Sequence, residues 1–194
     1  RENLDYPVYK NLEIKKLNKF SYFLNKYKSS KPEGEYRDFL DNLLQDTQNN
    51  YKTILEIGIS EGAGVFSLKD YYPNSYIWGV DIDPETFIVN DIQIKSCDCV
   101  DQLKLDSLTL NAKKFNTKYD LIVDDGWHHP ESQVNSLIAY LPYLNLNGLY
   151  IVEDIVHRDY YKIFLRVKDI LTIKNFEVSY HKFHVPGKAG ISDL

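Results

Sequence analysis

The chain has 194 residues, of which 43% are hydrophobic and 26% are charged, and its formal net charge is -5. This length and balance are typical of one globular domain with a full hydrophobic core, and the acidic charge without a lysine- or arginine-rich run argues against a nucleic-acid partner. No apolar stretch approaches the ~20 residues that span a bilayer, and the only two cysteines, Cys97 and Cys99, favour reduced thiols in a cytoplasmic protein.

The first fifty residues are expected to form a helical arm or cap, 1–50, ahead of a main domain at 51–194, the two making one compact unit. Within the arm, a turn-rich break at 29–35 precedes apolar residues at helical spacing. These residues are Tyr36, Phe39, Leu40, Leu43 and Leu44. The aromatic character of the arm is compatible with a homodimer.

After residue 51, short apolar runs alternate with helical patterns. The predicted strands are 53–58, 75–83, 91–96, 118–125 and 148–154, the predicted helices are 65–72, 131–144 and 160–171, and a late strand is expected at 176–185. This alternation predicts an α/β fold, a Rossmann-like, doubly wound, mostly parallel sheet with helices on both faces. Four of the strands run into Glu, Asp or Gly at the carboxyl ends, where such sheets bind ligands.

The segment LEIGISEGAG, residues 55–64, follows the first predicted strand and opens a helix. Its glycines Gly58, Gly62 and Gly64 permit a tight turn and a close approach of the backbone to a ligand. The spacing G-x-x-x-G-x-G differs from the G-x-G-x-x-G of dinucleotide binders, and the Lys-Ser/Thr ending of a P-loop is missing. Glu56, ahead of the first glycine, would suit a cationic ligand.

This loop resembles motif I of the class I S-adenosylmethionine-dependent methyltransferases. The resemblance implies that Gly58, Gly62 and nearby backbone hold the methionine part of the cofactor. Asp81, at the end of the second strand, would accept two hydrogen bonds from the ribose diol. Asp98, which Asp101 could replace, would meet the adenine. The expected cofactor-binding residues are Glu56, Gly58, Ser60, Gly62, Asp81 and Asp98.

Pairs of acids end the fourth and fifth predicted strands, namely Asp124 with Asp125 and Glu153 with Asp154. If these parallel strands are neighbours, ~4.8 Å apart, their end carboxylates converge and repel unless a cation or protons intervene. Carboxylates without thiolates suit Mg²⁺, Ca²⁺ or Mn²⁺. Asp124 points away from Asp125 in an extended strand, so we expect it to cap backbone amides or support the site.

The segments DDGWHH and GLYIVED together resemble the sugar O-methyltransferases of the macrocin and mycinamicin type and the related cephalosporin hydroxylase family. In those methyltransferases a D-G-x-H segment and a later Glu-Asp pair build a magnesium site. The resemblance, over roughly 53–155, implies that Asp125, Glu153 and Asp154 bind Mg²⁺. It also implies that His128 is the general base and that the acceptor is a small-molecule sugar.

Several histidines and one tryptophan leave alternatives open. His129 is expected in a turn, although it could exchange roles with His128, and Trp127 could cover the cofactor, line the acceptor pocket or simply pack. His181 and His184 are expected to be structural. The function predicted is an S-adenosylmethionine-dependent, Mg²⁺-assisted sugar O-methyltransferase. The alternatives are an NAD-binding oxidoreductase and a non-catalytic or assembly protein that retains the cofactor pocket.

Overall fold

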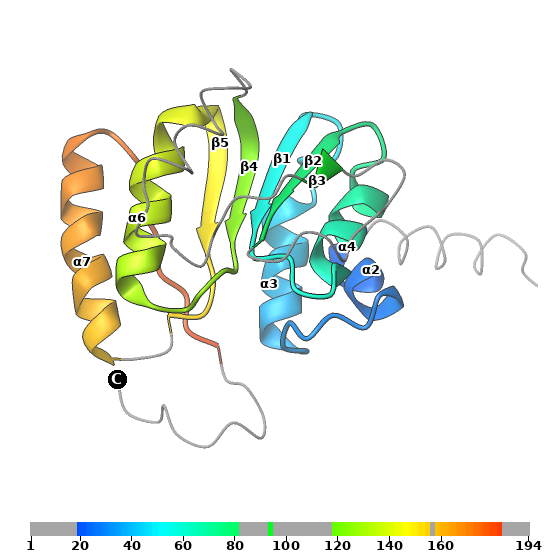
Figure 1. Cartoon of the computed structure of the whole chain (residues 1–194), viewed down its shortest axis with the longest axis horizontal. Helices are drawn as coiled ribbons and strands as arrows, with labels where there is room; N and C mark the ends of the chain where they lie inside the picture. Colours follow the sequence, from blue (N-terminus) through cyan, green and yellow to red (C-terminus); the bar gives the residue numbers. More distant parts are fainter. Residues whose placement is uncertain (1–18, 82–92, 95–117, 156–157, 184–194) are drawn as a thin grey trace, which may run out of the picture.

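The computed structural model describes residues 19–81, 93–94, 118–155 and 158–183. The helices in these ranges are α2 (Phe20–Lys26), α3 (Glu35–Leu44), α4 (Ala63–Tyr71), α6 (Pro130–Tyr140), the 3-10 turn η3 (Leu141–Tyr143) and α7 (Arg158–Ile173). The strands are β1 (Thr53–Ile57), β2 (Tyr76–Val80), β3 (Gln93–Ile94), β4 (Tyr119–Asp124) and β5 (Leu144–Val152). Figure 1 shows the sheet in the middle, with α6 and α7 to one side and α2, α3 and α4 to the other.

The strands form one sheet in the order β3-β2-β1-β4-β5, and each pair of neighbours is parallel. The chain adds β2 and β3 on one side of β1 and then returns to add β4 and β5 on the other. The strand order therefore reverses between β1 and β4, and open α/β sheets bind their ligands at such a switch point. The predicted Rossmann-like, doubly wound α/β fold is confirmed.

Both faces of the sheet are covered, because successive side chains of a strand point to opposite faces. In β1, Ile54 packs into a core with α2, α3 and α4, whereas Leu55 and Ile57 pack into a second core with α6. The first core also contains Phe20, Phe23, Leu24, Leu40, Leu44, Val65, Leu68, Tyr71 and Leu121. The second also contains Val80, Tyr119, Ile122, Ala139 and Tyr140. Burial on both faces explains the nearly continuous apolar strands.

Helices α2 and α3 belong to the first core rather than to a separate body. Leu24 of α2 and Leu40 of α3 are buried there. The two helices are also joined by the side chain of Ser21, which donates a hydrogen bond of 2.6 Å to Asp41. Their connection reaches the carboxyl edge of the sheet through Lys31, described below. The division of the chain at residues 50 and 51 stays a prediction.

The late strand expected at 176–185 is wrong for its described part, because residues 176–183 pair with no strand among the residues that the structure places. His181 and Phe183 pack on α3 instead, whereas Tyr180 lies against Tyr161 of α7. The ring of Phe183 lies 5.2 Å from that of Phe39, and the ring of His181 lies 4.3 Å from Phe39. Aromatic packing, rather than a backbone ladder, thus accounts for the alternating pattern, and His181 has the structural place expected of it.

The helix predicted at 131–144 ends earlier, at Tyr140, and β5 begins at Leu144 instead of residue 148. Pro142 lies in the intervening 3-10 turn, and proline lacks the N–H that would continue an α-helix. In the described ranges, none of the helices combines the length and apolarity that a membrane span requires.

Candidate active site

The turn after β1 lies directly against the segment that follows β4. Gly58 (φ 83°) and Gly62 (φ 88°) adopt conformations that favour glycine. A β carbon on Gly58 would lie 2.4 Å from the carbonyl oxygen of Asp125 and 2.5 Å from the α carbon of Gly126. The amide of Asp125 donates to the carbonyl of Ile57 at 2.9 Å. The glycine loop and the acidic segment therefore form one unit at the switch point.

Asp81 lies just past β2 and fastens the glycine loop. Its Oδ2 accepts hydrogen bonds from the backbone amides of Ile59 at 2.6 Å and Ser60 at 2.9 Å. Ser60 has φ 48°, an uncommon conformation for a residue with a side chain. The structure thus brings Asp81 and Ser60 together at the loop, whereas the binding of a ribose by Asp81 stays a prediction.

Glu56, also predicted to bind the cofactor, is buried beneath the loop. Burial raises the pKa of its carboxyl to about 8, although the charge of Lys31 acts in the opposite direction. Its Oε2 has no hydrogen-bond partner among the described residues. A buried carboxyl oxygen of this kind would stabilise a cationic group placed near it. Together with the close glycine backbone, this fits the sulfonium cofactor that the sequence predicts.

The two acidic strand ends lie side by side. Asp124 pairs with Val152 in the register of β4 and β5, so Asp125 and Glu153 follow as the next residues of adjacent parallel strands. The amide of Glu153 donates to the carbonyl of Asp124 at 2.9 Å. Because side chains alternate along both strands, Asp125 and Glu153 turn to the same face of the sheet. The predicted convergence of the strand-end carboxylates is confirmed.

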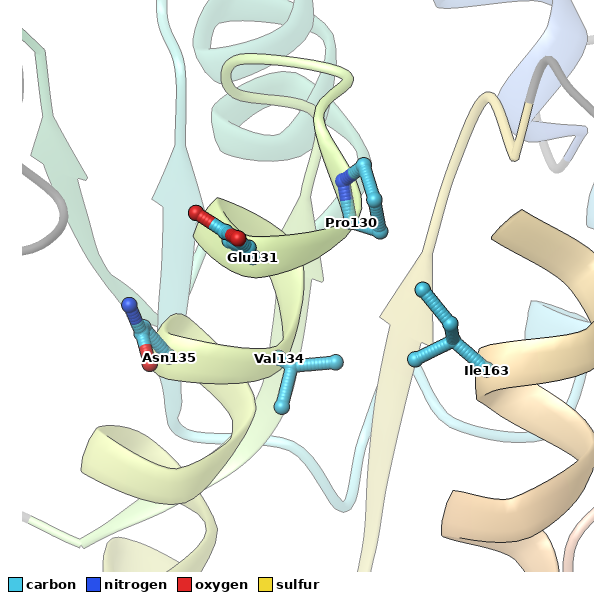
Figure 2. A pocket seen from close by; sticks show the side chains of 5 residues that line it. All are labelled: Pro130, Glu131, Val134, Asn135 and Ile163. Atoms are coloured by element: carbon cyan, nitrogen blue, oxygen red, sulfur yellow. The ribbon is translucent and has the colours of Figure 1, made fainter. Parts of the chain in front are cut away.

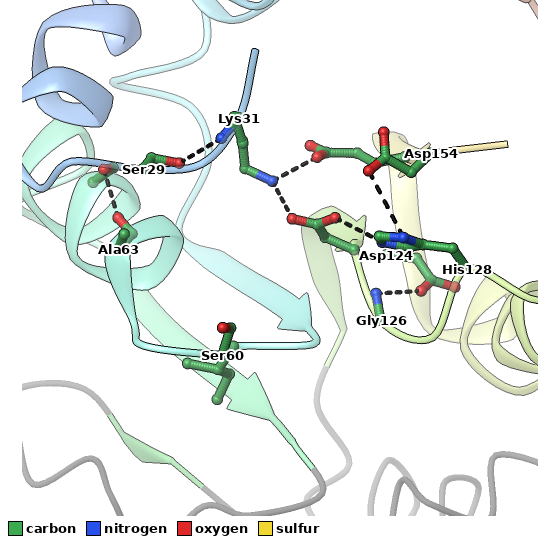
Figure 3. A network of polar contacts seen from close by, with 12 residues as sticks. Ser29, Lys31, Ser60, Ala63, Asp124, Gly126, His128 and Asp154 are labelled. Atoms are coloured by element: carbon green, nitrogen blue, oxygen red, sulfur yellow. Dashed lines mark hydrogen bonds and ion pairs between the residues drawn. The ribbon is translucent and has the colours of Figure 1, made fainter. Parts of the chain in front are cut away.

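A lysine from the connection between α2 and α3, Lys31, lies between the carboxylates of Asp125 and Glu153 and is labelled in Figure 3. Lys31 Nζ is 2.6 Å from Oδ2 of Asp125 and 2.5 Å from Oε2 of Glu153, and its side chain is buried. Burial opposes its charged form, but the charges of Glu153 and Asp125 raise the pKa of Lys31. Burial raises the pKa of Glu153. Burial acts in the same direction on Asp125, but the hydrogen bond with His128 and the charge of Lys31 outweigh it and hold the pKa of Asp125 below its usual range.

The backbone of Lys31 is held by Arg37 of α3. The guanidinium donates to the carbonyl of Lys31 from Nε at 3.1 Å and from Nη2 at 2.7 Å. It also donates to the carbonyl of Ser29 at 3.0 Å and to the side chain of Asn25. Lys31 was not predicted as a site residue. In the sequence it is one lysine in a turn-rich break, and no local pattern indicates its contact with Asp125, 94 positions later.

His128 contacts the second oxygen of the Asp125 carboxyl, opposite Lys31, and also lies near Asp154. Its Nε2 lies 3.3 Å from Oδ1 of Asp125 and its Nδ1 lies 3.7 Å from Oδ2 of Asp154. Ligand atoms of these three residues lie within 4.8 Å of one another, the spacing of a metal-binding group. The hydrogen bond to Asp125 raises the pKa of His128, as does the charge of Asp154. Asp154 has φ 52°, which turns it out of the strand.

The structure therefore divides the predicted metal ligands. Asp125 and Asp154 share a group with His128, whereas the carboxylate of Glu153 lies on Lys31. Carboxylate oxygens with one imidazole suit a divalent cation such as Mg²⁺ or Mn²⁺. The residues fit the metal that the sequence predicts, and the ligand set and the role of His128 stay predictions.

Asp124 supports this segment from the opposite face. Its side chain is fully buried, and Oδ1 accepts the amide of Gly126 at 3.3 Å. Burial raises the pKa of Asp124 to about 7, although the amide of Gly126 acts against this. Nearby, Gln133 of α6 donates to the backbone carbonyl of Glu153 at 2.8 Å. The expectation that Asp124 caps a backbone amide is confirmed.

Trp127, the residue before His128 in the chain, presents an exposed ring. The indole is 61% exposed and stacks on His129 at 5.3 Å, and His129 in turn lies 5.7 Å from the ring of Tyr160 in α7. His129 thus supports Trp127, while His128 contacts the acids. A separate pocket of about 270 Å³ lies between α6 and α7 (Figure 2). It is lined by Pro130, Glu131, Val134, Asn135 and Ile163.

Other predicted residues lie outside the described ranges. These are Asp98, its alternative Asp101, the two cysteines Cys97 and Cys99, and His184. The adenine-binding role of Asp98 stays a prediction.

The chain is similar in sequence to O-methyltransferases. The chain is 27% identical over 121 residues to mycinamicin VI 2''-O-methyltransferase from Micromonospora griseorubida, a match that covers 59% of this chain and 30% of that protein. Demethylmacrocin O-methyltransferase from Streptomyces fradiae is 27% identical over 130 residues, with the same coverage. The chain therefore matches about a third of the length of these curated relatives. No model of a protein family matches it.

Structure comparison gives the same relationship. The MycE methyltransferase of the mycinamycin biosynthetic pathway, solved with Mg, S-adenosylhomocysteine (SAH) and mycinamycin VI, superposes with a TM-score of 0.63 and 25% identity. The match covers 70% of this chain and 39% of that one. The chain has the fold of the class I S-adenosylmethionine-dependent methyltransferases. Within that fold it resembles the mycinamicin and macrocin O-methyltransferases. This resemblance does not favour the alternative of an NAD-binding oxidoreductase.

Proposed function

We propose that the chain is an S-adenosylmethionine-dependent, divalent-cation-assisted O-methyltransferase that acts on a sugar hydroxyl. The observation that carries this proposal is the group formed by Asp125, His128 and Asp154 beside the glycine loop. The resemblance to macrolide-sugar O-methyltransferases supports a sugar as the acceptor. The sugar belongs to a glycosylated natural product, a nucleotide-sugar or a surface polysaccharide.

The cofactor is held at the switch point between β1 and β4. Gly58, Gly62 and Ser60 provide the close backbone, and Glu56 provides a buried carboxyl for the cationic part. Asp81 positions the loop through two amides and binds the ribose. Asp98 meets the adenine.

Asp125, Glu153 and Asp154 hold the divalent cation. When bound, the cofactor supplies an electrophilic methyl group and the cation lowers the pKa of the acceptor hydroxyl. His128 accepts the hydroxyl proton, because a neutral imidazole is a base at neutral pH. Nε2 takes this proton in place of its contact with Asp125, and Asp154 beside Nδ1 stabilises the imidazolium that results. The chain's remaining task is to align the acceptor oxygen with the methyl group.

A methyl-transfer screen tests the proposal. The protein is incubated with S-adenosylmethionine labelled in the methyl group and with nucleotide-sugars or desmethyl macrolide glycosides, in the presence of Mg²⁺ or of EDTA. We expect transfer to one acceptor class, loss of transfer with EDTA and recovery on adding excess Mg²⁺. Thermal unfolding is measured beside it, and we expect a shift with SAH but none with NAD. A shift with NAD alone would show the oxidoreductase alternative to be correct.

A further inference from the structure

The ammonium of Lys31 takes the place between two carboxylates that the proposed function gives to a divalent cation. Its Nζ lies 2.6 Å from Asp125 and 2.5 Å from Glu153, so both oxygens are in direct contact with it. The side chain is buried in this position, and its backbone is held by the buried guanidinium of Arg37. The backbone of Lys31 is therefore held beside the site, and its ammonium is buried in contact with both carboxylates.

We propose that Lys31 competes with the divalent cation for Asp125 and Glu153, so that a cation can take both carboxylates only when the ammonium withdraws. The inference rests on the proposed function, since it takes these two residues as metal ligands. It assigns to the connection between α2 and α3 a role in setting how tightly the site binds metal.

Geometry makes the two occupants exclusive. A Mg²⁺ ion binds carboxylate oxygens at about 2.1 Å, and an ammonium in contact with the same two oxygens occupies that space. Two cations brought this close would also repel each other strongly in a buried site. The contested atoms are Oδ2 of Asp125 and Oε2 of Glu153.

The charges at the site also predict that Lys31 weakens the binding of a divalent cation. Without Lys31, the carboxylates of Asp125, Glu153 and Asp154 would attract a divalent cation with their full combined charge. The ammonium cancels part of this charge, which lowers the attraction. The charge of Glu56 also acts on Lys31. When Glu56 is ionised, its charge therefore adds to the attraction that holds the ammonium near the site.

Binding of Mn²⁺, followed by electron paramagnetic resonance of the free ion, tests the competition without reference to activity. The Lys31→Met variant keeps a long apolar side chain and removes the charge. We expect it to bind Mn²⁺ about tenfold more tightly than the unaltered chain, or better. The Lys26→Met variant is the matched control. Lys26 forms an ion pair of 2.5 Å with Asp70 away from the site, and its removal should leave Mn²⁺ affinity unchanged.

A second variant covers the case in which Lys31→Met does not fold. Lys31→Arg retains the charge and adds donors that can bind both carboxylates, so it should bind Mn²⁺ more weakly than the unaltered chain. Equal or weaker Mn²⁺ binding by Lys31→Met, or equal or tighter binding by Lys31→Arg, would overturn the competition.

The failure of the inference can be told from the failure of the proposed function. If the unaltered chain binds Mn²⁺ and Asp125→Asn does not, the metal site stands whatever the Lys31 variants do. If neither the unaltered chain nor Lys31→Met binds Mn²⁺, both the metal site and the competition are wrong. The thermal shift with SAH, measured on the same proteins, reports on the cofactor site alone.

Discussion

The carboxyl group of Glu56 lies against the α carbon of Gly64, so closely that a β carbon there would stand 2.1 Å from Oε1. Gly64→Ala should therefore push the carboxyl aside and destabilise the fold by about 1–3 kcal/mol. Urea denaturation of a double-mutant cycle with Glu56→Ala measures the contact. We expect the double variant to be more stable than the sum of the two changes predicts. Strict additivity would show that the carboxyl is not what Gly64 accommodates.

Glu56 also makes stability depend on pH. Its pKa rises from 4.5 to about 8 in the folded protein, so the folded state keeps a proton that the unfolded chain loses as pH rises above 4.5. The contribution is fully present below pH 4.5, and the free energy of unfolding falls as pH rises toward about 8. Glu56→Gln cannot ionise. Relative to that of the unaltered chain, its free energy of unfolding should therefore rise by on the order of 2–4 kcal/mol across this pH range. Urea denaturation at several pH values measures the difference, and parallel curves for the two proteins would contradict it.

Gly58→Ala tests the contact between the glycine loop and the acidic segment. The new β carbon would meet the backbone of Asp125 and Gly126, which cannot move as a side chain can. Gly34→Ala is the matched control, because Gly34 also has a positive φ, 79°, but nothing lies within 4 Å of its β-carbon position. We expect Gly58→Ala to cost at least about 2 kcal/mol more than Gly34→Ala in urea denaturation, and to weaken SAH binding. Similar losses for both variants would mean that only backbone strain is involved.

Replacing His128 should separate chemistry from binding. His128→Ala is expected to lower kcat by a factor of roughly 100–10,000 while SAH affinity stays nearly unchanged. His129→Ala is the natural comparison, because His129 lies next in the chain but contacts Trp127 and Tyr160 rather than the acids. Steady-state kinetics on both variants decide the assignment. The larger loss of kcat in His129→Ala would give the role of base to His129.

Trp127 is expected to contact the acceptor, since it precedes His128 in the chain with its ring exposed, and aromatic faces bind the apolar faces of sugars. Trp127→Ala should raise KM for the acceptor about three- to tenfold with little change in SAH affinity. Trp127→Phe keeps a ring and should retain most of the affinity. Because the indole is 61% exposed, neither change should alter the unfolding temperature much. Equal KM values for all three proteins would remove Trp127 from the acceptor site.

Much of the sheet could be predicted from local patterns. The apolar runs that became β1, β2 and β4 are buried on both faces, so their composition alone marks them as inner strands. The acids after β4 and β5 could be placed for the same reason, because alternation fixes which side chain faces which way. Because successive side chains of a strand point to opposite faces, Asp124 turns to the amide of Gly126 and Asp125 turns to Lys31 on the other face.

Other features depend on tertiary contacts that leave no local pattern. Residues 176–183 alternate like a strand, yet His181 and Phe183 pack on Phe39 and Tyr180 packs on Tyr161. Lys31 reaches Glu153 across 122 positions, and its place follows from how α2 and α3 pack on the first core. The acids, and the need for a cation among them, could be predicted from the sequence. The contact of these acids with the ammonium of Lys31 could not.

Asp154 combines the chemistry of the site with an uncommon backbone shape. At φ 52°, asparagine and glycine are the residues that would replace aspartate with little strain. A descendant of this chain that lost the reaction but kept the fold would therefore be expected to carry Asn or Gly at this position, and seldom Ala or Val. Among future homologues, aspartate here would mark chains that retain the chemistry, and asparagine or glycine would mark those that retain only the shape.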